Sequence, residues 1–65
     1  MDPNAAWQEL ADAYQENDLD RCNELAIGLL EWLTKGGYPP TITRHQKFDR
    51  FVVLRTCNAL VRATP

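Results

Sequence analysis

The 65-residue chain has no serine, one histidine and two cysteines. Without serine, a Ser-His-Asp triad is excluded. His45 and Cys57 are twelve residues apart on one predicted helix, which separates them by about 18 Å and excludes a Cys–His dyad. Cys22 could approach His45, although no spacing favours that pair. We therefore expect no enzyme, no catalytic residue and no cofactor.

Glycine and cysteine are too sparse to build a recognisable ligand site. Gly36 and Gly37 follow a predicted helix instead of preceding one, so no phosphate loop is expected. Cys22 and Cys57 lack C-x-x-C spacing and fall at apolar helix positions, which is typical of core thiols. Four acidic residues near the first turn lack the glycine and final Glu of a calcium loop, so we expect a solvated rim and no metal: Asp12, Glu16, Asp18 and Asp20.

Long apolar runs are absent as well. The longest covers the four residues 51–54, against the roughly 20 that a membrane-spanning helix needs. Residues 1–4 lack the basic segment and apolar run of a signal peptide. No asparagine stands in an N-x-[ST] acceptor context. We therefore expect a cytoplasmic protein with no membrane contact.

Three helix-forming segments predict a single all-α domain over residues 1–65. The first helix, residues 3–16, begins with Asp2 as N-cap and Pro3 at the first helical position. One apolar stripe follows the spacing i, i+3, i+4 and i+7: Trp7, Leu10, Ala11 and Tyr14.

The second helix, residues 19–35, has the clearest end in the chain. Gly36-Gly37 supplies a left-handed C-terminal residue, and Pro39-Pro40 prevents continuation. Glu31 and Lys35 are spaced to pair across one turn.

The third helix is predicted over residues 44–62. Thr43 and Gln46 match a capping box at its start. The connection lengths favour an antiparallel helical hairpin with the third helix packed across it.

Residues 5–34 resemble a single tetratricopeptide repeat. The match is Ala6-Trp7-Gln8-Glu9-Leu10-Ala11-Asp12-Ala13-Tyr14, with Cys22 and Ala26 at the small positions of the second helix. Nothing after residue 40 repeats the motif. The resemblance implies hairpin packing and an interaction module. The stretch 32–40 also looks like the helix ending of small uncharacterised bacterial and phage proteins, which implies no function.

Charge is divided sharply between the two halves of the chain. Residues 1–34 hold eight acidic residues against Arg21, a net charge of −7, whereas residues 35–65 hold six basic residues against Asp49, a net of +5. The third helix carries four bases within about 80° of one another and without an acid one turn away: Arg44, Lys47, Arg55 and Arg62. Phe51 and Asn58 share this stripe.

The third helix is also apolar over a wide arc, more than a two-helix hairpin can cover. We expect the surplus to form an interface: Phe51, Leu54, Cys57 and Val61.

Two functions follow from this helix. The first is a non-enzymatic protein-interaction or assembly module that binds itself, as a dimer or higher oligomer, or another protein. The alternative is nucleic-acid binding through the basic stripe, which the acidic balance of the chain disfavours.

Overall fold

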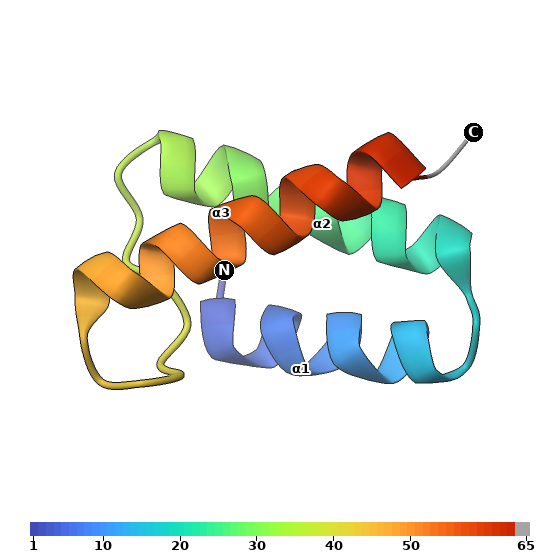
Figure 1. The fold of residues 1–65 in the computed structure, drawn as a ribbon, viewed down its shortest axis with the longest axis horizontal. Helices are drawn as coiled ribbons and strands as arrows, with labels where there is room; N and C mark the ends of the chain where they lie inside the picture. Colours follow the sequence, from blue (N-terminus) through green and yellow to red (C-terminus); the bar gives the residue numbers. More distant parts are fainter. Residues whose placement is uncertain (64–65) are drawn as a thin grey trace.

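The computed structural model describes residues 1–63 and contains three α-helices, with no strand among those residues. They are α1 (Pro3–Gln15), α2 (Leu19–Thr34) and α3 (Gln46–Ala63). Figure 1 shows α1 and α2 as an antiparallel hairpin with α3 lying across it. The predicted all-α fold of three helices is therefore confirmed.

Short-range signals in the sequence set the hairpin ends. Asp2 Oδ1 accepts hydrogen bonds from the backbone N–H groups of Asn4 and Ala5, at 3.0 and 3.3 Å, and Pro3 occupies the first turn. Asn17 adopts a left-handed conformation, with φ of 60°, which asparagine tolerates better than most residues. Asp18 then caps α2, accepting from the Arg21 N–H at 3.1 Å.

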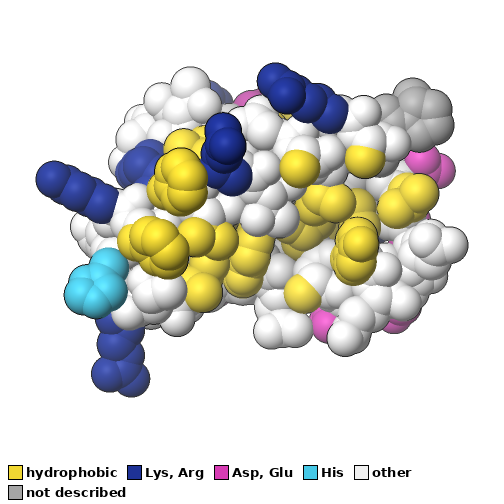
Figure 2. Space-filling view, in the orientation of Figure 1, with side chains coloured by type: hydrophobic (Ala, Val, Ile, Leu, Met, Phe, Trp, Pro, Cys, Tyr) yellow, Lys and Arg dark blue, Asp and Glu magenta, His cyan; other side chains and the backbone are white. Residues whose placement is uncertain are grey.

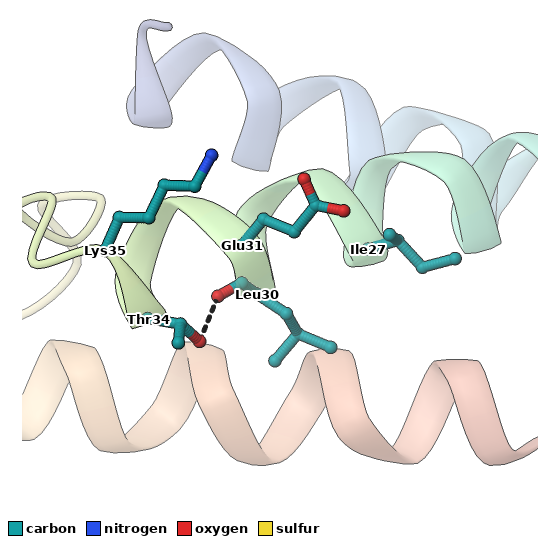
Figure 3. A pocket seen from close by; sticks show the side chains of 5 residues that line it. All are labelled: Ile27, Leu30, Glu31, Thr34 and Lys35. Carbon is teal, nitrogen blue, oxygen red and sulfur yellow. Dashed lines mark hydrogen bonds between the residues drawn. The ribbon is translucent and has the colours of Figure 1, made fainter.

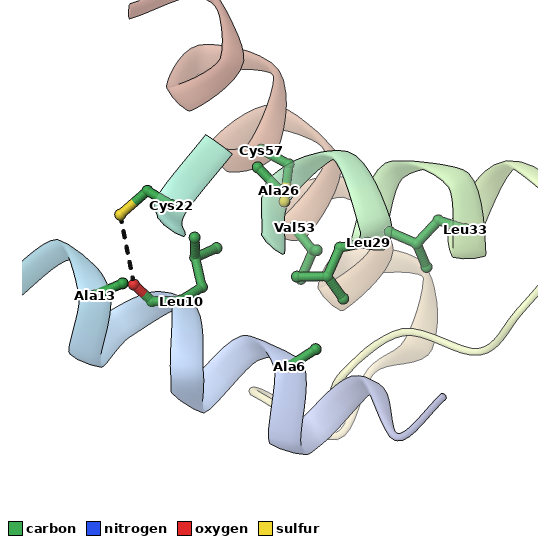
Figure 4. Close-up of a cluster of buried hydrophobic side chains, with 9 residues drawn as sticks. All are labelled: Ala6, Leu10, Ala13, Cys22, Ala26, Leu29, Leu33, Val53 and Cys57. Carbon is green, nitrogen blue, oxygen red and sulfur yellow. Dashed lines mark hydrogen bonds between the residues drawn. The ribbon is translucent and has the colours of Figure 1, made fainter. Parts of the chain in front are cut away.

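The core lies along α2, the middle helix of the three. Figure 4 shows nine buried side chains, which α1, α2 and α3 contribute in turn: Ala6, Leu10 and Ala13; Cys22, Ala26, Leu29 and Leu33; Val53 and Cys57. Both α1 and α3 pack on α2. Within residues 1–63, no Cα atom of α1 lies within 8 Å of a Cα atom of α3. The backbones of the two outer helices are therefore separated, and both helices are held by α2.

Hydrogen bonds join the loop between α2 and α3 to both helices. Gly36 has φ of +91°, as predicted for the end of α2. The Arg50 guanidinium donates to the carbonyls of Leu33 and Gly37, at 2.9 and 2.8 Å. Trp32 Nε1 donates to the Tyr38 carbonyl at 2.8 Å. These bonds hold the loop against the end of α2.

The start of α3 differs from the predicted capping box. The helix begins at Gln46, two residues later than expected, and Arg44 has φ of 71°, outside the helix. Buried Asp49 reaches back instead, accepting from the backbone N–H groups of Ile42 and Thr43 at 3.2 and 2.8 Å and from the Thr43 hydroxyl at 2.6 Å. The hydroxyl bond is the largest of several effects that lower the Asp49 pKa, against the raising effect of burial. A carboxylate in the first turn of α3 thus holds the segment that precedes the helix.

Candidate interaction groove

A surface groove of about 800 Å³ lies between α1 and α3. It exists because both helices pack on α2 while remaining apart from each other. Figure 2 shows hydrophobic side chains spread across this face, with Lys and Arg side chains along its upper edge and at the end nearest the α2–α3 loop. Ten residues line the groove: Trp7, Leu10, Ala11, Tyr14, Gln15, Arg55, Thr56, Ala59, Leu60 and Ala63. We name it the α1–α3 groove.

The α1 wall carries the apolar stripe predicted from the sequence. Of its four members, Leu10 alone is fully buried, whereas Trp7 is half-buried and Ala11 and Tyr14 are exposed, Tyr14 by 62%. The core positions of α1 include Ala6 and Ala13 instead. The helix therefore has two adjacent apolar faces, one for the core and one for the groove.

The α3 wall owes its hollow shape to small side chains. Ala59 and Ala63 are exposed there, beside the half-buried Leu60. At the edge of the groove the Arg55 guanidinium lies 5.6 Å from the centre of the Phe51 ring, a cation–π distance. Phe51 also stacks on Phe48 at 6.4 Å between ring centres, and both rings are more than half exposed, at 55% and 54%. Exposed aromatic surface is therefore present on the same helix as the groove wall.

The residues expected to form an interface on α3 are not brought together at the surface. Phe51 is exposed, but Leu54 and Val61 are half-buried and pack against the core cluster. Cys57 has no exposed surface, and burial raises its pKa to about 11. We therefore correct the expectation for Cys57, which belongs to the core. Cys22 is also fully buried, and desolvation, with a smaller effect of Asp18, raises its pKa.

The basic residues of α3 form no ion pair with an acidic side chain in the part of the chain described. The two ion pairs found within residues 1–63 both use Arg21, which contacts Glu9 at 3.1 Å and Glu24 at 3.4 Å. The acidic hairpin and the basic α3 are therefore not joined by an ion pair in this region.

The predicted basic stripe is shortened at its start. Arg44 precedes the helix, so Lys47, Arg55 and Arg62 are the members that remain on α3. Arg50 is not a member of the predicted stripe, and its guanidinium holds α3 to the α2–α3 loop.

A second, smaller hollow of about 290 Å³ lies on the outer side of α2 (Figure 3). The Thr34 hydroxyl at its edge donates to the Leu30 carbonyl of its own helix, at 2.7 Å. Glu31 and Lys35 also line it, and the ion pair predicted between them does not form.

Comparisons with protein-family models, curated proteins and solved structures found no match to the chain. The tetratricopeptide resemblance therefore stays a prediction. Across residues 1–63, no helix is both long and apolar enough to cross a membrane. The same residues contain no cluster of three or more His, Cys, Asp or Glu side chains that could hold a metal ion.

Proposed function

We propose that this chain is a small, non-enzymatic protein-interaction module whose binding site is the α1–α3 groove. The observation that carries the proposal is the exposure of aromatic and small apolar side chains along a groove between two helices. Aromatic residues are enriched in protein interfaces because they bury much area and lose little conformational entropy.

The shape of the groove favours a helical occupant. All of its lining residues come from α1 and α3, and both of these helices pack on α2, so a fourth helix laid along the groove would complete a bundle. Amphipathic helices bind such grooves by inserting an apolar face. The tetratricopeptide-like hairpin predicted from the sequence points to the same class of function.

Site-specific photocross-linking in the cells of origin tests the proposal. We expect benzoyl-phenylalanine at Ala59, in the groove, to capture a discrete protein adduct. The same group at Ala5 provides a matched control, because Ala5 is an exposed α1 residue that does not line the groove. Equal adducts at the two positions, or none at Ala59, would contradict the proposal. An adduct of twice the chain's 7.4 kDa mass would identify a second copy as the partner.

Nucleic-acid binding is the second candidate, and the lack of acidic partners for Lys47, Arg55 and Arg62 within residues 1–63 favours it. Exposed Phe51 beside Arg55 could stack on an unpaired base. Fluorescence anisotropy with a labelled 20-nucleotide single strand at 50 mM salt tests this candidate. Binding that weakens steeply with salt, and is lost in a Lys47→Glu/Arg62→Glu variant, would support it. No binding at that salt would remove it.

A further inference from the structure

The charge at the edge of the α1–α3 groove is positive, and it limits which partner can bind there. Of the ten lining residues, Arg55 is the one with a charged side chain, and all five from α1 are uncharged. Arg62 is exposed seven residues further along α3, which places it on the same edge about 10 Å away. The groove is therefore apolar with a basic edge, although the whole chain has a net charge of −2.

Three acidic residues of α1 lie on the side of the helix away from the groove. Glu9, Asp12 and Glu16 lie about 140° or more around α1 from Trp7, which lines the groove. Glu9 is turned toward α2, where it pairs with Arg21 at 3.1 Å. Charges on the far side of a helix about 10 Å wide are largely screened at physiological salt. A partner in the groove therefore meets Arg55 and Arg62 before it meets the acidic residues.

A second copy of this chain is a poor complement to that edge. Two grooves facing each other across a two-fold axis would bring the Arg55 and Arg62 edges of both copies into one interface, where like charges oppose association. The acidic face of α1, with Asp12 and Glu16, has only the small Ala5 to offer as an apolar contact. On α2, exposed Ile27 lies between Glu24 and Glu31, but one apolar side chain is too small to fill a groove that ten residues line.

We propose, resting on the proposed function, that the α1–α3 groove binds an amphipathic helix of another protein with acidic residues along one edge. The lining runs from Trp7 to Gln15 and from Arg55 to Ala63, about 12 Å on each wall, so the occupant contributes at least two helical turns. Its large apolar residues fall at i, i+3 or i+4 and i+7. Two acids seven residues apart on its α3 side contact Arg55 and Arg62.

Matched synthetic peptides test the charge preference. The probes are fluorescein-labelled 18-residue helices with Leu, Phe or Met at the apolar positions, each made with Glu and with Lys along one edge. We expect the best Glu peptide to bind at least about five-fold tighter than its Lys counterpart at 50 mM salt, because exposed ion pairs each change affinity by about 1.5- to 5-fold and two attractions are replaced by repulsions of similar size. At 300 mM salt the difference should shrink.

Variants of the protein locate the effect. An Arg55→Glu/Arg62→Glu double variant should reverse the preference, whereas Lys47→Glu, an exposed α3 charge that does not line the groove, should leave it nearly unchanged. Circular dichroism checks that each variant remains folded. Ala59→Trp should abolish binding by filling the groove, and Ala5→Trp should not.

The outcomes separate this inference from the proposed function. Equal affinity for Glu and Lys peptides, lost in Ala59→Trp, would overturn the charge preference and leave the groove as a binding site. Failure of every peptide would overturn the acidic-helix inference, and the cross-linking at Ala59 would then decide the proposed function separately. Sedimentation showing a dimer that Ala59→Trp dissociates would overturn the inference in favour of a second copy. Binding of the single-stranded nucleic acid in place of any peptide would overturn both.

Discussion

Replacing Arg50 by alanine removes the side-chain hydrogen bonds that join α3 to the end of α2. The half-buried Arg50 guanidinium donates to the Leu33 carbonyl at 2.9 Å and to the Gly37 carbonyl at 2.8 Å. These carbonyls lie in the last turn of α2 and just beyond it, and the Leu33 carbonyl also accepts from the Gly36 N–H at 3.1 Å. The variant leaves both acceptors without this partner and separates the loop from α3.

The expected loss follows from the type of bond. Hydrogen bonds to a charged group contribute about 1.5–3 kcal/mol each, and two such bonds that share one side chain should together contribute about 2–4 kcal/mol. A 65-residue domain has a total stability of about 3–10 kcal/mol, so Arg50→Ala should remove a large fraction of it. Arg50→Lys should lose less, about 1–2 kcal/mol, because an ammonium cannot reproduce the planar fork that reaches both carbonyls.

Urea unfolding followed by far-ultraviolet circular dichroism measures both changes. The slope of the free energy against urea should stay constant, which would place the effect in the folded state. The exposed substitution Arg62→Ala serves as the control and should change stability by less than about 0.5 kcal/mol. A loss below about 0.5 kcal/mol for Arg50→Ala would refute the stabilising role of the guanidinium. Equal losses for Arg50→Ala and Arg50→Lys would refute the requirement for its planar geometry.

Three further predictions concern the loop and the core. In Gly37→Ala a Cβ would overlap the Trp32 indole ring, so we expect a loss of about 1–3 kcal/mol in urea unfolding; a neutral effect would contradict the packing. Cys57→Ser should cost about 1–3 kcal/mol, more than Cys57→Ala, because it buries a hydroxyl where a thiol now packs without exposure; the reverse order would indicate a polar partner. The lowered pKa of Asp49 means that its contribution to stability is fully present above the ordinary Asp pKa of about 4 and is lost as pH falls through the pKa in the folded state. When the free energy of unfolding is measured from pH 6 to pH 2, it should therefore decline less steeply in Asp49→Asn than in the unchanged protein.

Local sequence signals predicted the parts of the fold that local physics decides. Asp2 with Pro3 identified the start of α1, and Gly36 identified the end of α2, because each of these residues acts on atoms within a few positions along the chain. The three-helix count followed from the same signals together with the apolar periodicity.

The start of α3 was predicted two residues early because a distant side chain overrides the local pattern. Thr43 and Gln46 fit a capping box, but the Thr43 hydroxyl bonds to Asp49 instead. Asp49 is six residues away in the chain, in the first turn of α3, and an acid at that position is typical of a helix start without indicating which preceding residue it binds. A buried carboxylate that holds a preceding turn becomes recognisable once the fold is known.

The α1–α3 groove was not predicted, and the reason is geometric. The helical periodicity of the sequence indicates that α3 is apolar over more than one face, but it does not determine the angle at which α3 crosses the other helices. The expected interface therefore included Cys57 and Val61, which α3 turns toward the core and the flank beside it. The surplus apolar surface opens instead toward Ala59 and Ala63.

The hydrogen bonds at the N-terminal end of α3 explain why the α1–α3 groove stays open. Arg50 and Asp49 hold the N-terminal half of α3 to the loop, and Asn4 of α1 accepts from the Thr41 N–H of the same loop at 2.7 Å. Figure 1 shows α3 rising away from α1 beyond this end. A domain this small buries only about 60% of the surface its unfolded chain exposes, so closing the helices over Tyr14 would add stability. The polar bonds at one end fix the direction of α3, and the apolar surface of the groove stays exposed, where the proposed partner would bind.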